Sequence, residues 1–498
     1  MFRGDEMAQG WNATSSRVMT GRTVIYSAER EVTRDNILAI FQDALTTHRN
    51  NATDIDYLYN YYKGKQPILN RTKQVREEIN NKIVVNRANE IVSFKVGYLM
   101  GEPVQYIHQG TDETTEELDL LNAYMNAEDK ASKDTELANW FHICGTSYRM
   151  IRPDEIGDID EAPFEIYTLD PRDTFVVYNG GIGHEPLMAC VAVTLPDGNV
   201  LYSGYTRTHY FEINQDALTR WDEHYLNGIP IIEYPANEAR MGAFELVLPI
   251  LDEINNLESN AVDGVEQLIQ AILVFQGVDL TDDQFTTLKQ QGAIKVSENG
   301  KVYYVSQDLS QANTQTIVKE AYQSVLDICG MPNRNGGYST SDTGKAVILR
   351  DGWSAAESRA KNSEMIFKVS EKAFLKQALN IMNTRNMALA LRSDERAATK
   401  ELKLSSIEIR FTRRNYENIL EKAQVLQMML TTPGIHPKLA FEHCGMFVDP
   451  DIAYKMSVDY AENEKAETAR ELEQIAIDEA EAEKLNVRIS GQGDSVSE

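Results

Sequence analysis

The clearest pattern of apolar positions runs from Leu246 to Phe275. Apolar residues recur there at every third or fourth position, which places them on one face of an α-helix. Pro249 suits the first turn of this helix, because deeper inside it would break a backbone hydrogen bond. At about 1.5 Å per residue, the predicted helix is on the order of 40 Å long. Its apolar positions are Val247, Leu251, Ile254, Leu257, Ala261, Val265, Leu268, Ile272 and Phe275.

The opposite face of this helix is polar, and its charged residues are all acidic. No Lys or Arg occurs between Arg240 and Lys289. One interpretation is an ordinary amphipathic helix that packs on a globular core. The other is a helix whose acidic face has a function of its own. The acidic positions on which that interpretation depends are Asp252, Glu253, Asp263 and Glu266.

Two short segments with strand character, 292–296 and 301–305, follow this helix. A second helical pattern then begins near Asn313, a good N-cap residue, and ends at Gly330, because glycine favours a helix C-terminus. Two helices that bracket a small segment with strands predict a stalk with a tip.

A loop of small and hydroxyl-bearing residues, 333–343, and a very long helical pattern up to residue 391 come next. The pair Gly344-Lys345 prompts a test for a phosphate-binding P-loop. That motif needs a glycine five residues before Gly344, a preceding strand, and Ser or Thr after the lysine. The chain has Ser339, a preceding helix and Ala346 instead, so the sequence argues against a P-loop.

The remaining parts of the chain are predicted from their periodicity. Residues 1–32 show no clear period and are expected to form a flexible arm. Helices are predicted over 33–48, from about residue 54 to Gly64, over 115–137 and over 416–430. A further helix is predicted to end at Gly101. Between 141 and 233 the period shifts toward two, which is typical of strands. The predicted strands are 147–152, 164–169, 175–178, 187–194, 200–205, 209–213 and 407–412.

Composition narrows the class of protein. With 498 residues and 42% hydrophobic residues the chain can bury a large core in several subdomains, and its net charge of −27 argues against a static binder of nucleic acid. The four cysteines have no C-x-x-C spacing, so we predict buried, reduced thiols. The start lacks the apolar segment of a secretory signal, and no apolar run reaches the ~18 residues of a membrane helix. We therefore expect a soluble protein that has no contact with a membrane.

The sequence predicts no catalytic, cofactor or metal site. The acidic residues in 154–161 lack the central glycine and terminal glutamate of an EF-hand loop. His436, His443 and Cys444 are close in sequence, but a zinc site needs a fourth ligand that the sequence does not offer. No nucleophile-elbow motif is present. We therefore expect that the protein is not an enzyme.

Two motifs near the start carry a family resemblance. The run from Tyr61 to Ile68, YYKGKQPI, resembles the signature YY-x-G-x-Q-x-I, and GYLMGEP from Gly97 to Pro103 resembles G-Y-x-x-G-x-P. In this order and spacing they are similar to portal proteins of tailed bacteriophages, of the type found in siphophages of Gram-positive bacteria (the SPP1-like portal family). The motif residues are Tyr61, Tyr62, Gly64, Gln66, Gly97, Tyr98, Gly101 and Pro103.

The resemblance implies an α+β, mainly helical portal fold that assembles as a ring, commonly of twelve subunits. Thr343-Gly344-Lys345-Ala346 resembles the S-G-x-A motif where the tunnel loop of these proteins meets the tunnel helix. The implied parts are an arm (1–32), a wing that is helical and then β-rich (33–242), stem helix 1 (243–275), a clip (276–312), stem helix 2 (313–331), a tunnel loop (332–344), a long tunnel helix (345–392), a return strand of the wing (393–415), crown helices (416–470) and an acidic tail (471–498).

The resemblance also implies a function. The ring would sit at one capsid vertex of the virion, after assembly in the host bacterial cytoplasm, and would help to nucleate the procapsid. Phage double-stranded DNA would enter through it and leave through it. The clip would contact terminase and the head-completion adaptor, and the wing would contact the major capsid protein and the scaffolding protein. The alternative is a DNA-processing enzyme or motor subunit that acts on phage DNA, against which the missing nucleotide and metal motifs count.

Two segments are expected to line the DNA channel. The acidic face of stem helix 1 would repel the polymer, or would meet basic groups on the adjacent subunit. The tunnel loop would form the narrowest point, because its two adjacent glycines allow large backbone excursions. The alternative is that this segment is an ordinary disordered linker between two helices. Its predicted channel residues are Asn333, Asn335, Gly336, Gly337, Ser339, Thr340, Ser341, Thr343 and Lys345.

Overall fold

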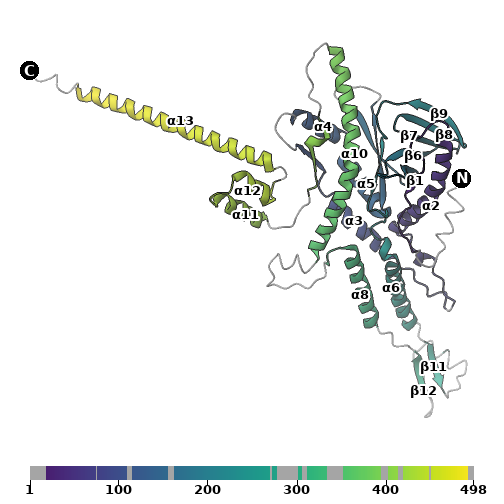
Figure 1. The fold of residues 1–498 in the computed structure, drawn as a ribbon. Helices are drawn as coiled ribbons and strands as arrows, with labels where there is room; N and C mark the ends of the chain where they lie inside the picture. The colour runs from purple at the N-terminus through teal and green to yellow at the C-terminus, as the bar shows by residue number, and fades with distance from the viewer. Residues whose placement is uncertain are drawn as a thin grey trace, which may run out of the picture. The chain divides into compact units, whose positions relative to one another are not determined.

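The structure is a computed structural model. The chain divides into two compact units, Met1–Arg413 and Arg414–Glu498 (Figure 1). The structure describes residues 18–74, 76–108, 115–154, 162–269, 272–276, 286, 301–305, 311–333, 352–393, 402–412, 419–447 and 450–491.

Two β-sheets form the β-rich part of the first unit. This is the region in which apolar positions at every second residue predict strands. β1 pairs in parallel with β5, and the other neighbouring strands are antiparallel. The six strands predicted here are all present, while β9 and β10 were not predicted. The six-stranded sheet has the order β1 (Ile25–Ser27), β5 (Thr174–Asn179), β6 (Pro186–Thr194), β7 (Val200–Thr206), β8 (His209–Asn214) and β9 (Ala217–Glu223). The three-stranded sheet has the order β10 (Ile231–Pro235), β3 (Thr146–Pro153) and β4 (Phe164–Leu169).

The N-terminal arm is packed onto this unit from residue 18 onward. The side chains of Met19, Arg22 and Ile25 are buried, and Arg22 donates to Glu245 Oε2 at 2.9 Å. The prediction of a flexible arm over 1–32 is therefore wrong for 18–32, because β1 in this segment completes the edge of the six-stranded sheet. Residues 1–17 lie outside the described part of the chain.

Helices cover the sheets and differ from the prediction in two places. The expected pair 33–48 and 54–64 is one continuous helix, and the expected helix 115–137 is two. The break comes at Asp129, whose φ of 50° is left-handed and cannot continue an α-helix. The observed helices are α2 (Ile37–Tyr62), α3 (Arg87–Leu99), α4 (Thr115–Ala127) and α5 (Lys130–Cys144), with the short 3₁₀ turns Pro67–Asn70, Glu245–Val247 and Leu404–Ser406.

The predicted stalk is present with one correction. α6 (Leu248–Ile269) packs side by side with α8 (Gln311–Cys329), and β11 (Ile272–Gln276) and β12 (Lys301–Val305) lie beyond their ends (Figure 1). The first helix thus ends before Ile272, because the apolar residues that follow pair as a strand, with Ile272 opposite Val305. The predicted strand 292–296 lies outside the described residues.

The long helix α10 (Trp353–Ser393) crosses the body of the first unit. Its Phe367, Phe374 and Leu375 join a core made with α4, α5, β3, β4 and β10. A second core joins α2, α3 and the first turns of α6 to the end of α8. The chain then continues through β13 (Ile407–Arg410), which pairs with β2 (Gln105–His108), so the strand predicted within 407–412 is present.

The second unit consists of α11 (Ile419–Thr431), α12 (Pro437–Cys444) and α13 (Pro450–Gly491). The segment expected as an acidic tail is helical up to Gly491, and 492–498 lie outside the described residues. All four cysteines are free and buried, as predicted. None of the helices in the described part of the chain combines the length and apolar character that crossing a membrane requires.

Candidate functional site

Most of the predicted channel loop lies outside the described residues. Asn333 is described, and its Nδ2 donates to Gln323 Oε1 at 2.5 Å. The other predicted channel residues of this loop lie outside the described residues: Asn335, Gly336, Gly337, Ser339, Thr340, Ser341, Thr343 and Lys345. What the structure does place are the two helices that this loop connects, α8 and α10.

The C-terminus of α8 is joined to the N-terminal part of α10 by Arg359. The Arg359 guanidinium donates to the backbone carbonyls of Ile328 and Asp327 in the last turn of α8, and the Asp327 carbonyl also accepts from the Gly330 N–H at 3.2 Å. Gly330 has a φ of +64°, and a Cβ built there would lie 2.2 Å from Arg359 Cδ. Glycine is therefore required both for the turn and for the approach of the arginine.

The polar face of α6 is covered by an extended segment of its own chain. Asn255 Oδ1, Ser259 Oγ and Asp263 Oδ1 accept hydrogen bonds from the backbone N–H groups of Val85, Ile83 and Asn81, at 2.8, 3.0 and 2.8 Å. The spacing matches, because four helical residues rise about 6 Å and two extended residues about 6.6 Å. We call these three α6 side chains with their N–H partners the polar ladder.

Asp263 at the end of the polar ladder also forms ion pairs with Arg71, at 3.2 Å, and with Lys73. Burial by itself would raise the pKa of the Asp263 carboxyl, but hydrogen bonds from Lys73 and Asn81 outweigh it and lower the pKa. Only 3% of the Asp263 side chain is exposed. This carboxylate therefore belongs to an internal contact of one chain.

The predicted acidic face of α6 is corrected at two of its four positions. Asp252 is buried and accepts from the hydroxyl of Tyr61 at 2.9 Å, and Asp263 is buried by the contacts above. Glu253 is exposed and Glu266 is partly exposed, so these two remain on a free surface of the single chain. The prediction failed at Asp263 because its cationic partners come from a segment about 190 positions earlier in the sequence.

The first sequence motif holds α6 in place. Gln66 Oε1 accepts from Asn255 Nδ2 at 2.5 Å, and Gln66 Nε2 donates to Asn86 Oδ1 at 3.1 Å. Tyr61 stacks on Phe244 in addition to its bond with Asp252. Two further motif residues shape the turn: Gly64 has a φ of +92° and ends α2, and the Tyr62 carbonyl accepts from Asn86 Nδ2.

The second motif holds the start of α10. Tyr98 donates to Glu357 Oε2 at 2.7 Å, and its ring lies 6.1 Å from that of Trp353. A Cβ on Gly101 would lie 2.5 Å from the carbonyl oxygen of Gly97, so glycine ends α3 there. A Cβ on Gly97 would meet nothing within 4 Å, so no contact among the described residues explains that glycine. Pro103 follows in the connection to β2.

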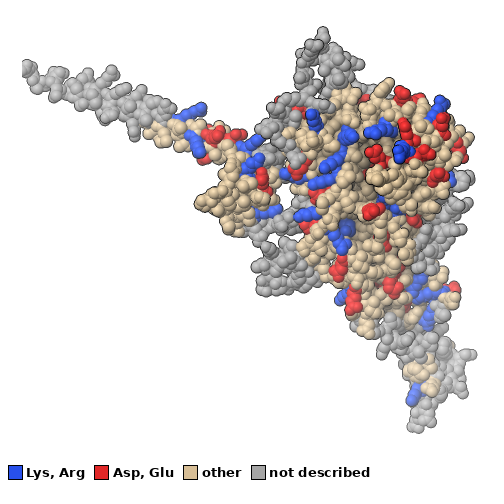
Figure 2. Space-filling model, viewed as in Figure 1, with Lys and Arg blue, Asp and Glu red and all other residues tan. Residues whose placement is uncertain are grey.

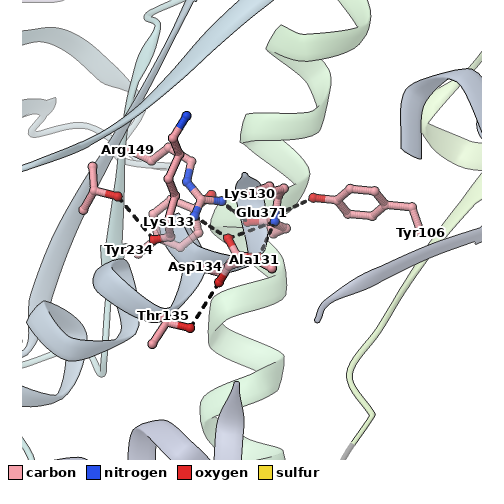
Figure 3. Close-up of polar contacts among 10 residues, drawn as sticks. Tyr106, Lys130, Ala131, Lys133, Asp134, Thr135, Arg149, Tyr234 and Glu371 are labelled. Carbon is pink, nitrogen blue, oxygen red and sulfur yellow. Dashed lines mark hydrogen bonds and ion pairs between the residues drawn. The ribbon is translucent and has the colours of Figure 1, made fainter. Parts of the chain in front are cut away.

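A buried group of charges, which we call the charge cluster, fixes the middle of α10 (Figure 3). Glu371 on α10 pairs with Lys130 of α5 at 2.8 Å and with Arg149 of β3 at 3.4 Å. Asp134 of α5 pairs with the same two cations. The side chains of all four charged residues are at most 5% exposed. Two positive and two negative charges balance, which a buried group requires.

Two tyrosines complete the charge cluster around Glu371. Tyr234 donates to Glu371 Oε2 at 2.7 Å, and Tyr106 donates to its other oxygen. Burial would raise the pKa of Glu371, but Lys130 and Arg149 lower it to about 2, so this side chain is ionised at neutral pH. Burial and the neighbouring Glu371 raise the pKa of both tyrosines, which remain neutral donors.

The charge cluster was not predicted from the sequence, although one signal for it is present. Glu371 occupies a position of α10 that falls on the same face as Phe367 and Phe374, four before and three after it. A glutamate on an apolar helix face needs a buried partner. The identity of that partner could not be found from periodicity, because Lys130 and Arg149 lie on other elements.

The chemistry of these groups favours a structural role. Burial lowers the pKa of His48 to about 4 and that of His142 to about 3, so both imidazoles are neutral at pH 7. Burial also raises the pKa of the Cys144 thiol to about 12, which leaves it unreactive. Within the described residues no group of His, Cys, Asp and Glu could hold a metal ion. The motif residues and the charge cluster hold α6 and α10, and Arg359 joins α8 to α10.

The chain is similar to a known protein family and, over most of its length, to solved structures. A sequence model of a phage portal protein family, described as SPP1 Gp6-like, matches residues 43–484. No curated protein matches the sequence. The chain is similar to one from a structure described as "Neck of native GTA particle computed with C12 symmetry", with a TM-score of 0.41, 13% identity, and 72% of this chain and 89% of that chain covered. A second chain, from a structure described as "Neck of empty GTA particle computed with C6 symmetry", is similar with a TM-score of 0.40 and 14% identity, and the match covers 72% of this chain and 90% of that chain.

Proposed function

Because this chain belongs to the SPP1 Gp6-like family of phage portal proteins, we propose that it assembles into the ring through which the phage genome is packaged and ejected. Its α+β, mainly helical architecture is a portal fold, and its function is that of a head–tail connector. It is a component of the virion. In the proposed ring, commonly of twelve copies, the axis is the path of double-stranded DNA.

The parts of the chain receive roles in this proposal. α6 and α8 form the stem, β11 and β12 belong to the clip, and α10 is the tunnel helix. The clip binds terminase during packaging and the head-completion adaptor afterwards. The two sheets with α2 to α5 form the wing, which contacts the major capsid protein and, in the procapsid, the scaffolding protein. Assembly takes place in the host bacterial cytoplasm, and the ring nucleates the procapsid.

The observation that carries this proposal is that side chains of the two motifs form hydrogen bonds with α6 and α10. Tyr61 and Gln66 bind the polar face of α6, and Tyr98 binds the first turns of α10. The first motif therefore positions α6, the first helix of the proposed stem, and the second motif positions α10, the proposed tunnel helix. These side chains are engaged in holding helices in place, which supports a structural role for both motifs.

The acidity of the chain suits a conduit. Phosphate contacts made by cations add salt-dependent affinity, which would slow the passage of DNA. After the correction at Asp252 and Asp263, two of the four predicted acidic residues remain available to face the channel, Glu253 and Glu266. The loop 333–345 remains our prediction for the narrowest point. Shortening this loop should leave ring assembly intact and reduce DNA filling, and unchanged filling would remove the loop from the proposal.

The mass of the particle in solution tests the proposal. Light scattering coupled to size exclusion should give a particle many times the 56.3 kDa of one chain, close to twelve copies. The same preparation should not hydrolyse ATP. A 56 kDa particle at the concentrations found in infected cells, or ATP hydrolysis that co-purifies with the chain, would favour the alternative of a motor or DNA-processing subunit.

A further inference from the structure

In this acidic chain, the long helix α10 is basic. Residues 353–393 contain seven Lys and Arg and three Asp and Glu, one of which is the buried Glu371, whereas the whole chain has a net charge of −27. Figure 2 shows several Lys and Arg side chains over the middle and lower part of this helix. A basic element in an acidic chain attracts acidic surfaces of other molecules, including further copies of the same chain.

The exposed side of α10 carries a stripe of mixed character, which we call the α10 stripe. Its members are spaced by three or four residues and so lie on one face of the helix. Met365 is 60% exposed and Val369 is 71% exposed, although both are large apolar side chains. The α10 stripe consists of Lys361, Met365, Val369, Lys372 and Lys376.

Within the described residues, the lysines of the α10 stripe have at most one ion-pair partner, and that partner lies on the same helix. Lys372 and Lys376 form no ion pair within the described residues, and Lys361 lies 3.6 Å from Glu357 with 62% of its side chain exposed. Methionine and valine between the lysines favour a protein partner over DNA, because phosphates satisfy the charges but leave the apolar side chains in water. The partner should therefore be acidic, with an apolar side chain at its centre.

The exposed face of α4 has this chemistry. α4 contains Glu116, Glu117 and Asp119 and no Lys or Arg. Leu120 is 40% exposed and lies on the same helix face as Glu116 and Ala123. Glu116 and Asp119 form no ion pair within the described residues. At about 1.5 Å per residue, the α10 stripe is roughly 22 Å long and α4 roughly 20 Å, so the two helices match in length.

One copy cannot bring these two faces together. The buried faces of both helices, with Leu118 and Leu121 on α4 and Phe367 and Phe374 on α10, pack into the same core. Each exposed face points away from that core, so the two faces of one copy diverge. We propose that the α10 stripe binds the exposed face of α4 from a second copy. Such a contact joins two different surfaces and repeats from copy to copy, as a closed ring requires.

This inference rests on the proposed ring and names a contact within it. The direct test is zero-length carbodiimide cross-linking of assemblies made from mixed ¹⁴N-labelled and ¹⁵N-labelled chains. We expect cross-links between Lys361, Lys372 or Lys376 and Glu116 or Asp119 that join one light and one heavy peptide. If rings form but these lysines are cross-linked only to peptides of the same isotope, or only to other carboxylates, the proposed contact is wrong. The proposal of a ring would stand in that case.

Charge reversal gives a second test that does not depend on cross-linking. Lys372→Glu with Lys376→Glu should reduce the assembled fraction at least tenfold, and adding Glu116→Lys with Asp119→Lys should restore it. Lys403→Glu, at another exposed lysine, is the matched control and should assemble normally. Normal assembly of the reversed variant overturns the contact. Normal assembly with impaired DNA filling would assign the α10 stripe to DNA instead. A wild-type chain that never assembles would contradict the proposed ring itself.

Discussion

α6 and α10 are both long helices that bury polar side chains, and they satisfy them in opposite ways. On α6 three neutral or acidic side chains, spaced by four residues, accept from the backbone of one extended segment. On α10 a single carboxylate, Glu371, meets two cations and two tyrosines from four other elements. The first contact is distributed along the helix, and the second is concentrated at one point.

This difference predicts how each helix responds to damage. A neutral hydrogen bond contributes about 1 kcal/mol, and its loss from the polar ladder leaves the neighbouring rungs in place. Removing one partner of a buried ion pair costs about 3–5 kcal/mol, because the remaining charge stays buried. α10 should therefore be sensitive to a single substitution, whereas α6 should lose stability in small steps.

The largest effect is expected for Glu371→Ala. The free energy of unfolding should fall by about 3–5 kcal/mol, because Lys130 and Arg149 are left with one counter-charge. Urea denaturation followed by circular dichroism measures it. Glu364→Ala, on the same helix and paired with Lys368 nearer the surface, is the control, with an expected loss under about 1 kcal/mol. Equal losses for the two variants would show that the charge cluster does not hold α10.

Acid should remove the contribution of the charge cluster. The pKa of Glu371 is lowered to about 2 in the folded chain, against roughly 4.3 for an ordinary glutamate. A carboxyl whose pKa is lowered in the folded state stabilises the fold at pH values above its ordinary pKa. That contribution is lost as the pH falls toward the folded-state pKa of about 2. The stability difference between wild type and Glu371→Gln should therefore shrink from about pH 5 downward. A difference that stays constant over this range would contradict the ion pairing.

A smaller loss is expected for Asp263→Ala, about 1–3 kcal/mol. This variant removes the acceptor of the Asn81 N–H and the partner of Arg71 and Lys73, but both cations keep some contact with water. Asp263→Asn keeps a neutral acceptor and should recover part of the loss in the same denaturation experiment. A loss below about 0.5 kcal/mol for the alanine variant would mean that the polar ladder contributes little to holding α6.

The smallest effect within the polar ladder is expected for Ser259→Ala, about 1 kcal/mol, because one backbone N–H loses its acceptor. Hydrogen exchange of the Ile83 amide should become faster in this variant. Glu253→Ala changes an exposed position of the same helix and should stay within about 0.5 kcal/mol of wild type with unchanged exchange at Ile83. An Ile83 amide that exchanges equally in both variants would argue against the hydrogen bond to Ser259.

Periodicity predicted the helices and the β-rich region well, because burial of one face repeats along each element. It failed where a partner distant in sequence decides the structure. The helix predicted up to Phe275 ends at Ile269, because the next residues pair with β12. The arm from residue 18 is ordered, because β1 finds an edge strand and Arg22 finds Glu245.

The candidate site shows the same division. The two motifs identified the residues that position α6 and α10, but their contacts could not be derived from spacing. The acidic character of α6 was correct as a property of its sequence and misleading as a property of its surface, since residues 71 and 73 supply the missing cations. Glu371 could have been noticed on an apolar helix face, whereas Lys130 and Arg149 could be assigned to it only in three dimensions.

The most direct test of the whole account is an image of the purified chain. Negative-stain electron microscopy should show rings viewed along their axis, each with a stain-filled central hole and a rotational symmetry near twelve. Fields of single compact particles without a hole, at concentrations where size exclusion shows the protein to be folded, would contradict the proposal that α6, α8 and α10 surround a passage for DNA.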